Sequence, residues 1–125
     1  MKGRPFLQRM GFALDGLRAG WSREASFRTQ TMMAVATMIS LVVLRPAPIW
    51  WAVTVLVVAI ILALELLNSA IEGVIDLFHP GLHPEIKAVK DMVAGAVLVI
   101  SLAALAIGIA LVADRGPVVL REWFR

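Results

Sequence analysis

Three long runs of residues without a charged side chain dominate this sequence and limit what it can fold into. They cover residues 29–44, 46–64 and 92–113, which are 16, 19 and 22 residues long. A helix needs about 20 mostly apolar residues to cross the hydrocarbon core of a bilayer. The first run is short, so we expect its helix to extend back to Glu24. The pattern therefore predicts three transmembrane helices.

The composition supports a one-domain membrane protein. Of the 125 residues, 60% are hydrophobic, against about 45–50% in an ordinary soluble domain. The sequence has no cysteine, which excludes disulfides and thiolate metal sites. The net charge is +3, and the basic residues cluster beside the apolar runs, which favours anionic lipid headgroups over nucleic acid as a partner. No uninterrupted apolar core precedes Thr29, so we expect no secretory signal peptide.

Prolines and glycines set the expected ends of these helices. Arg45-Pro46-Ala47-Pro48 ends the first, because proline cannot continue a helix. The second has no breaker before His79-Pro80-Gly81, so it continues well past its uncharged run. Asp114-Arg115-Gly116-Pro117 closes the third. We predict one all-α membrane domain over residues 1–125, with transmembrane helices at about 24–45, 48–78 and 86–113.

Residues 5–22 have the pattern of an amphipathic helix. Five apolar side chains fall on one stripe at helical spacing: Phe6, Met10, Leu14, Leu17 and Trp21. We expect this helix to lie in the membrane interface with its apolar face down. A soluble helix packed on a core is the alternative.

The distribution of lysine and arginine predicts the orientation in the membrane. With the N-terminus inside, the inner segments hold eight of these residues: six before the first span, together with Lys87 and Lys90. The outer segments hold the other four. Positive residues accumulate on the cytoplasmic side, so we predict a cytoplasmic N-terminus.

Ionisable side chains occur in and beside the spans, where each costs about 2.5–3.5 kcal/mol on insertion. At 100° per residue, four polar residues of the second helix share a face about 80° wide. We call this set the polar stripe: Glu65, Asn68, Glu72 and Asp76. Charged residues also open the other two helices: Glu24 and Arg28 on the first, and Lys87, Lys90 and Asp91 on the third. If the helices pack together, these groups can converge on one polar pocket.

Such a pocket contains what phosphoryl transfer requires. Carboxylate and amide oxygens suit Mg²⁺, lysine binds phosphates, and a remaining carboxylate can accept a proton from a hydroxyl group. The same pattern also fits helix-end charges that hold an oligomer together, or a proton relay. The glycine-rich and kinase motifs of soluble nucleotide-binding folds are absent, so any ATP site is built differently.

Two blocks of sequence resemble a known family. Residues 65–72 read ELLNSAIE, followed by Asp76 and by Lys90-Asp91, and residues 16–21 read GLRAGW, followed by EASFR at 24–28. In this order and spacing, over roughly residues 11–110, the chain resembles the prokaryotic diacylglycerol kinases, a family that includes undecaprenol kinases. The resemblance implies a surface helix and three transmembrane helices that form a homotrimer in the bacterial inner membrane. Active sites then lie between subunits at the cytoplasmic interface, where ATP with Mg²⁺ meets a lipid hydroxyl.

The resemblance also implies roles for individual residues. Glu65 is the expected general base, Glu24 and Glu72 are the expected metal ligands, and Asn68 and Asp76 support the site. The implied ATP contacts are Phe12, Glu24, Glu72, Gly81, Leu82, His83, Lys90 and Asp91. The implied lipid contacts are Arg18, Ala19, Gly20, Trp21, Ser26, Phe27, Arg28, Thr29, Gln30, Glu65 and Ala94. Without the resemblance, His83 is a turn residue, Asp76 a partner at a helix end, and Trp21 an interfacial anchor.

One departure concerns the substrate. The best-known diacylglycerol kinases have a serine where this chain has Ala94, and the segment KDMVAGA at 90–96 looks more like the undecaprenol kinase branch. We expect diacylglycerol, giving phosphatidic acid, with undecaprenol as the alternative. A non-enzymatic membrane module, such as a small proton-coupled transporter, is the alternative of another class. It predicts isolated carboxylates near the middle of the bilayer.

Overall fold

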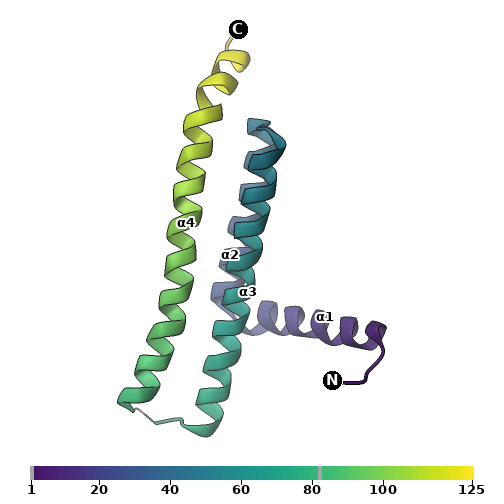
Figure 1. Cartoon of the computed structure of the whole chain (residues 1–125), viewed down its shortest axis with the longest axis vertical. Coiled ribbons are helices and arrows are strands. Elements are labelled where there is room, and N and C mark those ends of the chain that lie inside the picture. The colour runs from purple at the N-terminus through teal and green to yellow at the C-terminus, as the bar shows by residue number, and fades with distance from the viewer. Residues whose placement is uncertain (1, 82) are drawn as a thin grey trace.

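The computed structural model describes residues 2–81 and 83–125, and in this part of the chain the fold is all-helical. Four helices follow one another: α1 (Phe6–Arg23), α2 (Ala25–Leu44), α3 (Pro48–Phe78) and α4 (Pro84–Trp123). The last three lie along the long axis of the molecule, and α1 projects sideways from them (Figure 1). The most extensive packing is between α3 and α4.

Helices α2, α3 and α4 are long and apolar enough to span a membrane, with 20, 31 and 40 residues. At 1.5 Å per residue, 20 helical residues match a hydrocarbon core of about 30 Å. The structure therefore contains the three long apolar helices that the sequence predicts, each able to span a membrane. Most of their large apolar side chains are exposed in a single chain, which suits a lipid environment.

The turn between α2 and α3 follows local rules. Arg45 ends α2 in the left-handed conformation, with φ 49°, and its N–H donates to the carbonyl of Leu41 at 3.0 Å. Pro48 is the first residue of α3, a position at which the missing N–H of proline costs nothing. This end of the bundle carries the buried side chains of Leu41 and Pro46.

The turn between α3 and α4 is set by His79 and His83. The N–H of His79 donates to the carbonyl of Ile75 at 2.7 Å and ends α3. His83 caps α4, because its Nδ1 accepts a hydrogen bond of 3.1 Å from the N–H of Glu85. Pro84 takes the first position of α4, two residues before the predicted start.

The prediction that α4 ends near residue 113 is wrong, because the helix continues through Pro117 to Trp123. Proline removes a main-chain donor and crowds the preceding turn, at a cost of about 3 kcal/mol. Tertiary contacts hold this part of the helix in place. The guanidinium of Arg115 donates to the carbonyl of Leu44 at 3.0 Å, which ties α4 to the end of α2, and Val119 is buried.

A sharp corner separates α1 from α2 at Glu24, whose backbone is extended. Its N–H donates to the carbonyl of Gly20 at 3.0 Å. Gly20 is buried, and a Cβ atom there would lie 2.5 Å from Cδ2 of Leu66. Glycine at this position lets α1 approach α3 closely, next to Glu65. The placement of α1 on a membrane surface stays a prediction.

Candidate active site

Glu65 is the most deeply buried charged residue of the described chain, with 5% of its surface exposed. Among residues 2–81 and 83–125, no hydrogen bond or ion pair reaches its carboxylate. A buried carboxylate without a partner is costly and commonly marks a functional position in a membrane helix.

Asn68 lies three residues further along α3 and on the same face. Its Oδ1 is fully buried and has no hydrogen-bond partner in the described part of the molecule. Buried polar atoms are nearly always paired, so an orphaned amide oxygen points to a missing ligand or a missing neighbour. Glu65 and Asn68 therefore form the enclosed part of the polar stripe.

The exposed part of the stripe meets α4. The ammonium of Lys90 donates to Oδ1 of Asp76 at 2.8 Å, across the turn between the two helices. Glu72 is half-buried on the turn of α3 between Asn68 and Asp76. The structure thus pairs the lysine with the outermost carboxylate of the stripe, one helical turn from Glu72.

The other predicted nucleotide contacts at the start of α4 are exposed. Lys87 and Asp91 form an ion pair of 2.6 Å within one helix. Gly81 and His83 lie in the exposed turn, and the His83 ring already accepts a main-chain hydrogen bond. Leu82 lies outside the described residues.

Glu24 is half-buried at the corner of α1 and α2. Arg28 follows Glu24 by one helical turn. Its guanidinium donates a hydrogen bond of 2.7 Å to the carbonyl of Trp21. The two predicted metal ligands come from different elements, Glu24 from the corner of α1 and α2 and Glu72 from α3. Their joint binding of a metal ion stays a prediction.

The oxygen atoms of the site suit a Mg²⁺ ion by their chemistry, although in the described part of the chain they do not form a complete set of metal ligands. The described residues contain no group of three or more histidine, aspartate or glutamate side chains that could hold a metal ion. Mg²⁺ usually keeps several waters and binds through one or two carboxylates together with substrate phosphates. Glu72, with the unpaired oxygen of Asn68 on the same face, offers donors of that kind.

The predicted lipid contacts surround the corner between α1 and α2. Phe27 is buried beside Gly20, where its ring lies 3.4 Å from the position of a Cβ atom on that glycine. Arg18 is exposed and pairs with Asp15 at 3.3 Å. The remaining members of the set differ in burial. Ala19 and Gln30 are half-buried, whereas Trp21, Ser26, Thr29 and the more distant Ala94 are exposed.

Phe12 is the predicted ATP contact that lies on α1. It is 43% exposed on α1 and lines a shallow hollow of that helix. The other residues of the hollow are Phe6, Arg9, Met10 and Ala13. No described contact links Phe12 to the polar stripe.

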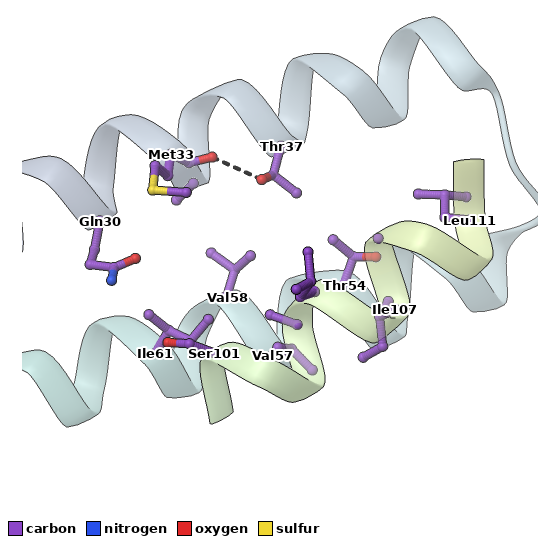
Figure 2. Close-up of a pocket in the computed structure, with 14 residues that line it drawn as sticks. Gln30, Met33, Thr37, Thr54, Val57, Val58, Ile61, Ser101, Ile107 and Leu111 are labelled. Atoms are coloured by element: carbon purple, nitrogen blue, oxygen red, sulfur yellow. Dashed lines mark hydrogen bonds between the residues drawn. The ribbon is translucent and has the colours of Figure 1, made fainter. Parts of the chain in front are cut away.

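A cavity of about 340 Å³ lies between α2, α3 and α4, and its described lining contains no carboxylate (Figure 2). Its wall is mostly apolar, and Gln30 is the predicted site residue that reaches it. Thr54 is also on this wall, 6% exposed, and its hydroxyl has no partner in the described part of the chain. Sequence reasoning missed Thr54, because a threonine in an apolar helix normally bonds a carbonyl of its own helix. Thr37 does so with Met33, at 2.8 Å (Figure 2).

Comparison with known proteins points to one family. The family model described as prokaryotic diacylglycerol kinase matches residues 11–112. The diacylglycerol kinase of Escherichia coli K12 is 33% identical over 89 residues, which are 71% of this chain and 73% of that protein. The diacylglycerol kinase of Helicobacter pylori J99 is 30% identical over 88 residues, 70% of this chain and 69% of that protein. The undecaprenol kinase of Bacillus subtilis 168 is 36% identical over 86 residues, 69% of this chain and 70% of that protein.

Proposed function

We propose, because this chain belongs to the prokaryotic diacylglycerol kinase family, that it transfers the γ-phosphoryl group of ATP to the hydroxyl group of a membrane lipid. The observation that carries the proposal is the extent of the family match. Residues 11–112 include the whole polar stripe, the corner at Glu24 and the lysine at the start of α4. A lipid kinase with three helices able to span a membrane meets its second substrate within the bilayer.

Glu65 is the proposed general base. Its carboxylate accepts the proton of the lipid hydroxyl while the hydroxyl oxygen forms a bond to the γ-phosphorus. The bond between that phosphorus and the bridging oxygen breaks, and ADP leaves. General-base catalysis of this kind contributes roughly 10²–10⁴-fold. The burial of Glu65 supports this role, because water competes poorly for an enclosed carboxylate.

The remaining polar groups hold the nucleotide. Glu24 and Glu72 are the proposed ligands of the Mg²⁺ ion that accompanies ATP, and Asn68 orients the groups around them. When bound, this ion neutralises phosphate charge during the transfer. Lys90 offers a point charge to the phosphates. Asp91, Phe12, Gly81, Leu82 and His83 are the other proposed nucleotide contacts.

Diacylglycerol is the first proposed substrate, giving phosphatidic acid. Undecaprenol is the second, favoured by Ala94 within the KDMVAGA segment and by the similarity to the undecaprenol kinase of Bacillus subtilis. The lipid hydroxyl enters at the corner of α1 and α2, along residues 18–21 and 26–30. Gln30 connects this surface with the apolar cavity between the spans.

A homotrimer in the bacterial inner membrane, with the N-terminus in the cytoplasm, is the proposed assembly. In the described residues of one chain, the buried oxygen of Asn68 has no hydrogen-bond partner. This favours an active site that a neighbouring subunit completes. α1 then rests on the cytoplasmic surface, where its basic residues attract anionic headgroups.

A two-lipid phosphorylation assay tests this function. The purified chain in lipid nanodiscs is incubated with Mg²⁺ and radiolabelled ATP, with either diacylglycerol or undecaprenol present. We expect labelled lipid phosphate from at least one of them, formed roughly 10²–10⁴-fold more slowly by the Glu65→Gln variant. Absence of product with both lipids contradicts the kinase function. It favours the alternative of a non-enzymatic membrane module, such as a small proton-coupled transporter.

A further inference from the structure

Two carboxylates of the polar stripe compete for one lysine. Asp76 and Glu72 are four residues apart on α3, so they face the same way. The ammonium of Lys90 pairs with Asp76 at 2.8 Å, whereas Glu72 makes no ion pair in the part of the chain that the structure describes. The fold therefore selects the outer carboxylate as the partner of Lys90.

The pair between Lys90 and Asp76 affects the availability of the Glu72 carboxylate. Lysine is a flexible point charge on a four-carbon stem, so it turns to whichever carboxylate is nearest. If Asp76 lost its charge, the nearest remaining carboxylate on that face would be Glu72. A pair between Lys90 and Glu72 would occupy the oxygens that the proposed function assigns to the metal ion. Binding of the metal would then require that pair to break.

We propose that Asp76 is a positioning residue that holds the ammonium of Lys90 away from Glu72 and so keeps the Glu72 carboxylate free for the metal ion of the nucleotide. This inference rests on the proposed function for the role of Glu72. It assigns Asp76 a definite task, beyond general support of the site. The geometry suits that task, because the ion pair links the last turns of α3 to the first turns of α4.

The first experiment measures the metal directly and needs no turnover. Mn²⁺ is titrated into the full-length protein in nanodiscs with a non-hydrolysable ATP analogue present, and free Mn²⁺ is followed by electron paramagnetic resonance. We expect Asp76→Asn to raise the apparent dissociation constant by about two- to fivefold, the range typical of exposed ion pairs. Asp76→Glu keeps the charge and should return the constant to within about twofold of the parent.

A matched control and a double variant separate positioning from a structural effect. Asp114→Asn removes the same charge at the opposite end of α4, on an exposed residue, and should leave Mn²⁺ binding unchanged. In a Glu72→Gln background, Asp76→Asn should have no additional effect, because its action passes through Glu72. Size-exclusion chromatography and circular dichroism establish that each variant is folded.

The outcomes separate this inference from the proposed function. If the parent protein binds Mn²⁺ with the analogue but phosphorylates no lipid, the proposed kinase function is contradicted. The effect of Asp76→Asn on Mn²⁺ binding can still be measured in that case. Unchanged Mn²⁺ binding in Asp76→Asn overturns the inference. An equal loss in the Glu72→Gln background also overturns it, and so does a parent protein that binds no Mn²⁺ with the analogue.

Discussion

The guanidinium of Arg28 donates a hydrogen bond of 2.7 Å to the main-chain carbonyl of Trp21, seven residues earlier in the chain. Trp21 lies in the last turn of α1, where main-chain carbonyls have no partner within the helix. A positive charge at that end also interacts favourably with the helix dipole. Glu24 lies between the two residues, so this bond fixes the corner that carries a proposed metal ligand.

Arg28→Ala should therefore loosen the corner without unfolding the spans. A hydrogen bond contributes about 0.5–1.5 kcal/mol net, so amide exchange at Glu24 should rise by about two- to tenfold. Hydrogen-exchange mass spectrometry of peptides covering residues 20–25 measures this. Arg23→Ala is the control, because it removes an equally basic residue from the last turn of α1 that makes no hydrogen bond in the described part of the chain. Equal exchange in the two variants would mean that the bond does not hold the corner.

Glu65→Gln should abolish most of the turnover and leave the fold intact. The amide keeps the shape of the carboxylate but cannot accept the proton, so we expect kcat to fall by roughly 10²–10⁴-fold. Removal of an unpaired buried charge should not lower the thermal stability. Glu85→Gln, on an exposed residue in the first turn of α4, serves as the control and should retain full activity. Near-normal turnover in Glu65→Gln would remove this residue from the role of base.

Glu72→Gln should change the dependence on magnesium more than the dependence on lipid. Loss of a supporting residue around a metal typically costs about 10–100-fold in affinity, so loss of a ligand should raise the magnesium requirement at least tenfold. Steady-state rates across a Mg²⁺ titration at saturating ATP measure this, with Glu122→Gln at the far end of α4 as the control. A superimposable titration curve would show that Glu72 does not bind the ion.

Local rules predicted the two turns between the spans, because proline and glycine act on their immediate neighbours. Pro48 begins α3 and His79 ends it, at the residues expected from the sequence. The polar stripe also follows from helical geometry alone. Periodicity gives the face of a residue, however, and not its partner on another helix. It could not show that Lys90 pairs with Asp76 rather than with Glu72.

The continuation of α4 and the orphaned hydroxyl of Thr54 were not predictable for a related reason. Pro117 reads as a helix end in any local rule, and the contacts that keep the helix intact come from Arg115 reaching the carbonyl of Leu44. Likewise, the isolation of the Thr54 hydroxyl depends on how three helices enclose the cavity. Both features belong to packing between distant segments.

Thr54→Val should leave the stability unchanged or raise it. The hydroxyl is buried without a hydrogen-bond partner in the described residues, and a buried unsatisfied polar group costs about 1–3 kcal/mol. Valine has nearly the same shape and removes that cost. Thermal unfolding in detergent micelles, followed by circular dichroism, measures the effect.

Thr37→Val is the matched control on the facing wall of the same cavity, because it gives up the 2.8 Å hydrogen bond to Met33. The two substitutions change the same atoms on two walls of one cavity, although Thr37 is half-buried and Thr54 is buried, so their difference reports mainly the state of the Thr54 hydroxyl. We expect Thr54→Val to unfold at a higher temperature than Thr37→Val. The reverse order would mean that the Thr54 hydroxyl has a partner in the assembled protein, supplied by water, lipid or a neighbouring subunit.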